Sequence, residues 1–322
     1  MNSNSRIYVA GRNGLLGSAI VRALRRFGYN NILTSNRLAL DLTDHLQVEK
    51  FFAGRLPEYV FLCAARVGSI AENISYPAEF LFDNAQIELN VINNAHLYGV
   101  NKVLFFGSNC FYPVNCPQPI SEDFYMTGSP EPTNLSYATA KILGLEMCRA
   151  YNKQYRATSY VCAVPASMYG PGDRFDLSRS HVLASLVIKF SEAASSNSPE
   201  VILWGDGSPM REFIYVDDVA NAAVFMMNDY NPTADEINRG DIFMNVGTRV
   251  DISIKNLAET VGRIVGFSGK ITWDERKPNG AARKLLDSSR IYNRGWRPQT
   301  NLEDGIRLTY QQYSRRKRAK QP

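Results

Sequence analysis

Three glycines at three-residue spacing join a strand-like run to an amphipathic helical run near the start of the chain. Arg6 to Ala10 is short and mostly apolar, and Gly17 to Phe27 carries apolar residues at helical spacing. Between these runs the glycines are Gly11, Gly14 and Gly17. At such a junction they let the backbone turn tightly and approach a pyrophosphate at the helix N-terminus. The pattern therefore predicts a dinucleotide-binding loop, in preference to an ordinary turn.

Strand and helix patterns alternate along the first half of the chain. Strand-like runs lie at 31–34, 59–65, 102–107 and 158–164, with helical patterns at 79–98 and 137–155. This alternation predicts an α/β fold with a doubly wound, Rossmann-type parallel sheet. After a turn signal at 170–173, shorter elements predict a smaller, discontinuous α/β domain. We expect residues 1–169, with about 212–250 returning, to bind the dinucleotide, and residues 170–211 and about 251–322 to bind substrate.

The composition is that of an ordinary globular protein, with 45% hydrophobic and 21% charged residues among 322. The formal charge of +5 includes a basic run at 315–318, which predicts a solvated terminus and no nucleic-acid partner. No run approaches the roughly 18 apolar residues of a membrane span, and we expect no secretory signal. Five scattered cysteines without a C-x-x-C pair predict no disulfide framework, no metal site and a cytoplasmic location.

The end of the second predicted strand lacks the acid that NAD-binding proteins place there for the ribose 2′-hydroxyl. It reads Thr34-Ser35-Asn36-Arg37, and a second arginine, Arg12, lies inside the glycine loop. Two guanidinium groups suit a 2′-phosphate because each offers a fork of charged donors. The alternative is that both are solvated side chains. We predict NADP as the cofactor.

Tyr137 and Lys141 stand four residues apart in a helical pattern, which places them on one helix face. We expect the lysine to lower the pKa of the phenol, so that Tyr137 exchanges a proton with a substrate carbonyl. Ser108, just after a predicted strand, can hydrogen bond to the same oxygen. The Y-x-x-x-K spacing alone is common in helices, but with the glycine pattern and the serine it predicts a carbonyl reductase.

Longer runs carry a more specific resemblance. They lie at 11–21, 64–68, 107–113, 131–134, 137–141, 169–171, 180–182, 204–205, 209–213, 216–218 and 283–287. Through them the chain resembles the GDP-L-fucose synthases of the extended short-chain dehydrogenase/reductases over almost its whole length. The resemblance implies NADPH-dependent 3,5-epimerisation and 4-reduction of GDP-4-keto-6-deoxy-D-mannose to GDP-L-fucose. It also implies a homodimer built on the helices at 79–98 and 137–155.

The same resemblance implies two further catalytic residues, Cys110 and His181. A ketone at C4 acidifies the protons at C3 and C5, and inversion there needs one group to remove a proton and another to deliver one. A thiol and an imidazole are suited to this near neutral pH. We favour Cys110 as base and His181 as acid, with the reverse assignment left open. Without the resemblance, a buried hydrophobic cysteine and a structural histidine would be the simpler interpretations.

The resemblance further implies which residues contact the ligands. The expected cofactor contacts are Gly11, Arg12, Asn13, Gly14, Leu15, Leu16, Gly17, Arg37, Ala64, Lys141, Pro165, Ser167, Met168 and His181. The expected contacts to the GDP-sugar are Lys189, Trp204, Arg211 and Asn279. Four stretches depart from the family pattern. The segment 165–168 differs from the usual Pro-Thr-Asn-Leu, Asn109 replaces a serine, Leu135-Ser136 replaces Glu-Pro, and Asn279 replaces an aspartate.

These departures leave a second enzymatic interpretation open, a related GDP-4-keto-deoxysugar epimerase/reductase of the colitose or 6-deoxyheptose type. A non-enzymatic NADP sensor on the same fold is disfavoured because Ser108, Tyr137 and Lys141 are all present.

Overall fold

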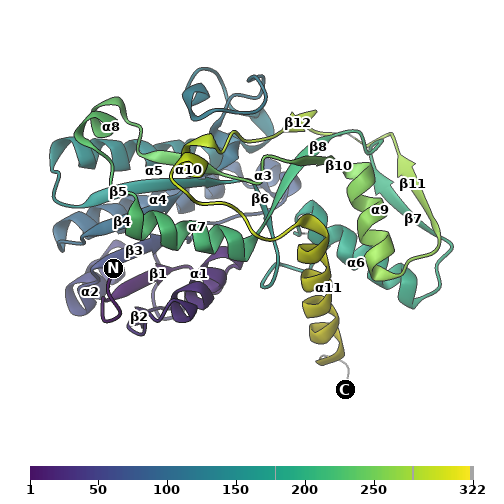
Figure 1. The fold of residues 1–322 in the computed structure, drawn as a ribbon, viewed down its shortest axis with the longest axis horizontal. Helices are drawn as coiled ribbons and strands as arrows, with labels where there is room; N and C mark the ends of the chain where they lie inside the picture. Colours follow the sequence, from purple (N-terminus) through teal and green to yellow (C-terminus); the bar gives the residue numbers. More distant parts are fainter. Residues whose placement is uncertain (178, 278, 320–322) are drawn as a thin grey trace.

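The computed structural model describes residues 1–177, 179–277 and 279–319 of the chain (Figure 1). Its central feature is a parallel sheet of six strands in the order β2-β1-β3-β4-β5-β9. The strands are β1 (Ile7–Ala10), β2 (Ile32–Leu33), β3 (Tyr59–Leu62), β4 (Lys102–Phe106), β5 (Ser159–Pro165) and β9 (Phe243–Val246). Because β2 and β3 flank β1 on opposite sides, the strand order reverses direction there. Ligands of such sheets bind at the carboxyl edge beside this reversal.

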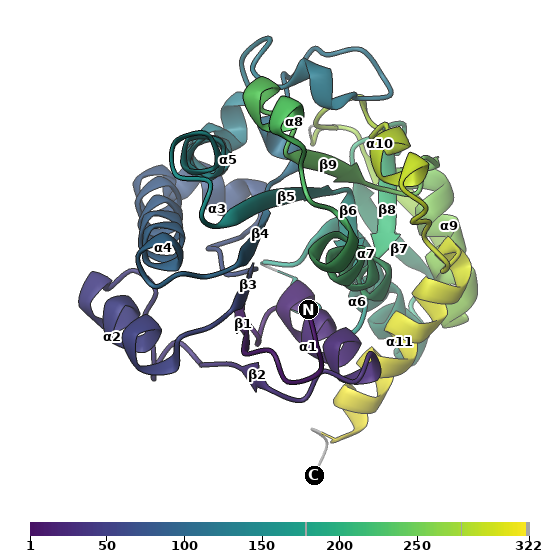
Figure 2. The same ribbon diagram turned by 60° about the vertical axis from the view of Figure 1, so that its left-hand side comes forward.

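Helices cover both faces of this sheet, as Figure 2 shows. On one face lie α1 (Leu15–Arg26) and α7 (Val216–Asp229), and on the other α2 (His45–Arg55), α4 (Pro77–Leu97) and α5 (Leu135–Gln154). The strands need cover on both sides because β1, β4 and β9 are buried along their whole length. The Rossmann-type fold predicted from the alternating pattern is confirmed.

A second group of elements packs beyond the carboxyl edge of the sheet (Figure 1). Strands β6 (Ser167–Tyr169), β8 (Met210–Tyr215), β10 (Asp251–Ser253) and β12 (Arg283–Lys284) form a four-stranded sheet, and β7 (Glu200–Trp204) pairs with β11 (Lys270–Asp274). Helices α6 (Val182–Ser195), α9 (Ile254–Val265) and α11 (Leu302–Ala319) share a second hydrophobic cluster with them. The short helices are α3 (Ile70–Ser75), α8 (Ala234–Arg239), α10 (Ser289–Asn293), η1 (Asn109–Phe111), η2 (Glu122–Phe124) and η3 (Pro132–Asn134). The division of the chain into a dinucleotide-binding and a substrate-binding domain, with its boundaries, stays a prediction.

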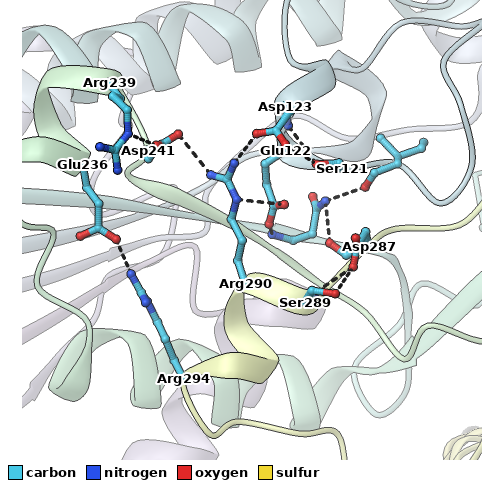
Figure 3. Close-up of polar contacts among 12 residues, drawn as sticks. Ser121, Glu122, Asp123, Glu236, Arg239, Asp241, Asp287, Ser289, Arg290 and Arg294 are labelled. Carbon is cyan, nitrogen blue, oxygen red and sulfur yellow. Dashed lines mark hydrogen bonds and ion pairs between the residues drawn. The ribbon is translucent and has the colours of Figure 1, made fainter.

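Ion pairs around Arg290 join three separate segments (Figure 3). Its guanidinium lies 3.4 Å from Glu122, 2.5 Å from Asp123 and 3.2 Å from Asp241. Glu122 also accepts a 2.8 Å hydrogen bond from the backbone N–H of Asn245 in β9. Burial raises the pKa of Glu122 to about 7, against the effect of Asn245 and Arg290. The cluster fixes α10 against η2 and against the start of β9.

No helix in the described ranges combines the length and the apolar character that crossing a membrane requires.

Candidate active site

The loops that follow β1, β3, β4 and β5 meet at the carboxyl edge of the sheet. The loop after β1 turns at Gly11, whose φ of +90° favours glycine. A Cβ atom on Gly11 would lie 2.8 Å from the Cα of Ala64, which follows β3. The glycine thus allows the two loops to touch, and it brings together two residues that the sequence predicted to contact the cofactor.

The same loop packs against the first turn of α1. The N–H of Gly14 donates to the carbonyl of Gly11 at 3.0 Å, and a Cβ atom on Gly17 would lie 2.2 Å from that carbonyl oxygen. Gly14 is the N-cap of α1 and supplies no capping side chain. The first N–H groups of α1 are therefore available to an anionic group such as a pyrophosphate.

Of the two arginines predicted to bind a 2′-phosphate, Arg12 lies inside this loop and Arg37 follows β2, the strand that pairs with β1. Arg12 Nη1 donates to Thr34 Oγ1 at 3.0 Å, just after β2. The Arg37 side chain is 77% exposed, and its Nε lies 3.6 Å from Asp41 Oδ2. An exposed arginine with one long ion pair can turn toward a phosphate at small cost.

Ser108, Tyr137 and Lys141 come together where β4 ends against α5. Tyr137 and Lys141 lie one turn apart in α5, with Lys141 Nζ 5.8 Å from the centre of the Tyr137 ring. Burial raises the pKa of the Tyr137 phenol, whereas the charge of Lys141 and a hydrogen bond with Ser108 act to lower it. The lysine thus acts in the expected direction, but our expectation of a lowered phenol pKa is wrong because burial outweighs it.

Lys141 has a partner that the sequence did not single out. Its Nζ lies 3.0 Å from Glu88 Oε1 of α4, with 3% and 1% of the two side chains exposed. Gly144 leaves room for this carboxyl group, since a Cβ atom there would lie 2.5 Å from Glu88 Oε2. Burial acts to lower the pKa of Lys141, but the Glu88 carboxylate raises it above its usual value. The sequence around Glu88 offers no local signal for this pair, because residues 79–98 contain a second glutamate, Glu79, at another helical position.

Cys110 lies in η1, two residues after Ser108. The backbone N–H of Cys110 donates to Ser108 Oγ at 3.2 Å, so the serine caps this short helix. The sulfur accepts a hydrogen bond from Asn134 Nδ2 at 3.1 Å. Asn134 is a second site residue that sequence reasoning did not single out, although it lies in a family-like run.

His181 is the N-cap of α6, and its side chain is exposed. In the described part of the chain no hydrogen bond joins it to Ser108, Cys110 or Tyr137. It lies close enough to Asp173 to act on that carboxyl group: burial raises the pKa of Asp173, whereas a hydrogen bond from the Arg174 backbone and the charge of His181 act to lower it. His181 thus belongs to the start of α6, which packs in the second hydrophobic cluster, whereas Tyr137 lies in α5 and Cys110 in η1.

The residues expected to bind the GDP-sugar lie around β7 and β8. Trp204, 67% exposed, ends β7, and Asn279 Oδ1 accepts from the N–H of Asp206 at 3.0 Å. Lys189 of α6 donates to the carbonyl of Ile202 at 3.2 Å, also on β7. Arg211 lies in β8, which pairs with β12. These elements therefore gather an indole, two cations and an amide on one side of the molecule.

The last expected cofactor residues lie where the two groups of elements join. Pro165 ends β5, and Ser167 and Met168 open β6, which pairs with β8.

Among the described residues, no group of three or more His, Cys, Asp and Glu side chains could hold a metal ion.

Comparison with known proteins gives a consistent set of relatives. Residues 7–242 match the NAD dependent epimerase/dehydratase family. GDP-L-fucose synthase 1 of Arabidopsis thaliana is 45% identical, covering 97% of this chain and 94% of that protein. The GDP-L-fucose synthase of Escherichia coli strain K12 is 43% identical, covering 96% of each. A solved GDP-mannoheptose C4 reductase from Campylobacter jejuni with NADP bound is similar at a TM-score of 0.89 and 36% identity, covering 98% of this chain and 99% of that one.

Proposed function

Because the chain belongs to the NAD dependent epimerase/dehydratase family, and within it to the GDP-L-fucose synthases, we propose that it converts GDP-4-keto-6-deoxy-D-mannose to GDP-L-fucose with NADPH. The observation that carries this proposal is the placement of Cys110 two residues from Ser108, beside Tyr137 and Lys141. One site then holds a carbonyl-reducing group and a nucleophilic group able to remove a proton next to that carbonyl.

NADPH fits the glycine loop. The contact of Gly11 with Ala64 and the uncapped start of α1 form a cradle that any Cβ atom at Gly11 or Gly17 would fill. Arg12 and Arg37 would hold the 2′-phosphate. When bound, NADPH supplies the hydride that reduces C4.

In both half-reactions, side chains of this protein bind the C4 oxygen of the substrate. Ser108 and Tyr137 hydrogen bond to it, which stabilises the enolate formed during epimerisation. Tyr137 then gives its proton to this oxygen during reduction, and the charge of Lys141 stabilises the phenolate that remains. Cys110 removes the proton from C3 or C5, and His181 delivers a proton to the opposite face of the sugar ring. We keep Cys110 as base and His181 as acid.

The GDP part of the substrate would be held by Lys189, Trp204, Arg211 and Asn279. Cations suit the diphosphate, and an exposed indole can pack against a base or sugar. A related GDP-4-keto sugar is the second candidate, favoured by the similarity to the GDP-mannoheptose C4 reductase.

We further propose a homodimer through α4 and α5 and a cytoplasmic location. The two helices leave large apolar side chains exposed, including Phe82 at 65% and Leu97 at 61%. All five cysteines are free thiols, which suits a reducing compartment.

The test is product analysis by NMR after reaction with GDP-4-keto-6-deoxy-D-mannose and NADPH in deuterated water. We expect GDP-L-fucose with deuterium at C3 and C5. Cys110→Ala and His181→Ala should suppress this labelling by orders of magnitude, with NADPH binding retained. A D-configured product without label from the native protein would contradict the proposal and favour a simple C4 reductase.

A further inference from the structure

Among the described residues, the sulfur of Cys110 has one close polar partner outside its own short helix. Asn134 Nδ2 approaches Sγ to 3.1 Å, whereas the contact of Sγ with Asn109 Oδ1 is 3.8 Å. Asn134 ends η3 and directly precedes α5, the helix that carries Tyr137 and Lys141. The cysteine and the reducing pair are thereby connected through one residue.

The side chain of Asn134 does not have the role that its position would give it. Asparagine is among the residues favoured at helix N-caps, where its side chain accepts from an N–H of the first turn. Asn134 is the N-cap of α5, yet its side chain makes no capping hydrogen bond. Its Oδ1 is buried and, within the described ranges, has no hydrogen-bond partner. The amide is therefore turned from the helix toward the sulfur.

This orientation suits a sulfur that must carry negative charge. Only a thiolate can take a proton from carbon, and an N–H donor stabilises the anion while Oδ1 would repel it. The start of α5 adds to this effect, because the partial positive charge at a helix N-terminus favours a nearby anion.

We propose that Asn134 is a positioning residue for epimerisation, which holds the Cys110 sulfur toward the sugar ring and stabilises it as an anion through the Nδ2–Sγ hydrogen bond. The inference rests on the proposed function. In the step it supports, the C–H bond at C3 or C5 breaks and an S–H bond forms. The C–H electron pair moves into the ring, and the negative charge passes from sulfur to the C4 oxygen between Ser108 and Tyr137.

The first experiment measures alkylation of Cys110 by iodoacetamide against pH, read by mass spectrometry of the peptide that contains this cysteine. Asn134→Asp keeps the shape of the side chain and its ability to cap α5, but replaces the donor with a negative charge. We expect the midpoint of its alkylation profile to move up by one pH unit or more. Asn134→Ser, which caps a helix but is shorter, should shift it in the same direction by less. The matched control is Asn30→Asp, the same change at an exposed residue before β2, on the opposite edge of the sheet.

The second experiment measures deuterium exchange at C3 and C5 separately from reduction. At pH 7 we expect Asn134→Asp to lose about 10- to 100-fold in exchange, the range for a hydrogen bond to a charged group. Part of the loss should be recovered at higher pH. Reduction of the already epimerised ketone should stay within about threefold of native, since Tyr137 and Lys141 are untouched.

The outcomes separate the two proposals. An unchanged alkylation midpoint in folded Asn134→Asp overturns the role of Asn134. An absence of exchange in the native protein refutes the proposed function, while the alkylation profile still decides the contact between Asn134 and Cys110. Equal loss of exchange and of reduction, with the same melting temperature as native, would also overturn the inference, because the effect would then not be specific to the thiol.

Discussion

Replacing Gly17 by alanine tests whether the glycine loop is built on backbone contact. The new Cβ atom would lie 2.2 Å from the carbonyl oxygen of Gly11, 2.7 Å from its carbonyl carbon and 3.0 Å from the N–H nitrogen of Arg12. Overpacking costs about 1–3 kcal/mol where side chains can move aside. Here the neighbours are backbone atoms, so we expect about 3 kcal/mol. The better helix propensity of alanine returns about 1 kcal/mol, which leaves a net loss of about 2 kcal/mol, or roughly 30-fold in the folding equilibrium.

Gly54 supplies the matched control for this change. It lies inside α2, and a Cβ atom there meets nothing within 4 Å. Gly54→Ala should therefore stabilise the protein by about 0.5–1 kcal/mol and leave NADPH binding unchanged. Urea unfolding gives the free energies, and fluorescence titration gives the Kd for NADPH, which should rise at least tenfold in Gly17→Ala. Native stability and native NADPH affinity in Gly17→Ala would refute the reasoning.

Three further substitutions test the cofactor preference, the proton donor and the ion-pair cluster. Arg37→Asp should remove most of a preference of at least tenfold for NADPH over NADH, measured as kcat/KM, because it replaces a charged donor to the 2′-phosphate; equal native values for the two cofactors would contradict this. Tyr137→Phe should lower the reduction rate about 100-fold or more and still bind NADPH, and near-normal turnover would exclude Tyr137 as acid. Glu122 has a pKa of about 7 in the folded protein, against its usual 4.5. Between these two pH values the carboxyl group binds more protons in the folded than in the unfolded protein, so its contribution to the free energy of unfolding falls as the pH rises through that window. Urea unfolding at pH 5 and pH 8 should show that the native protein loses about 2.5 kcal/mol of stability relative to Glu122→Gln, and parallel pH profiles would be the contrary result.

Local patterns were sufficient for the elements that form the sheet. The alternation of apolar runs and helical spacing predicted the strands at 59–65, 102–107 and 158–164, and the structure has β3, β4 and β5 there. The predicted strand at 31–34 is only two residues long, since β2 is an edge strand whose residues are half-buried. The sixth strand, β9, was not identified, because four residues after a long return of the chain give too little periodicity to recognise.

The candidate site shows a different limit. Sequence motifs identified Ser108, Cys110, Tyr137 and Lys141, because these residues are close together in the chain or repeat a family pattern. The partners Glu88 and Asn134 were not singled out, since each pairs with its target across tens of residues and is recognisable only once α4, η1 and α5 are packed together. A buried carboxylate has no local signature that distinguishes it from a solvated one.

The balance of charges around Tyr137 also bears on the direction of the reaction. A dehydrogenase needs a tyrosine that has already lost its proton, whereas a reductase needs one that keeps its proton until hydride reaches the carbonyl carbon. Burial raises the pKa of Tyr137, and Lys141 offsets this only in part because Glu88 pairs with its charge. At neutral pH the phenol is therefore protonated, as proton donation to the C4 oxygen requires. The same buried ion pair keeps Lys141 charged. This charge stabilises the Tyr137 phenolate that remains after the proton transfer, and the stabilisation favours the reduced product.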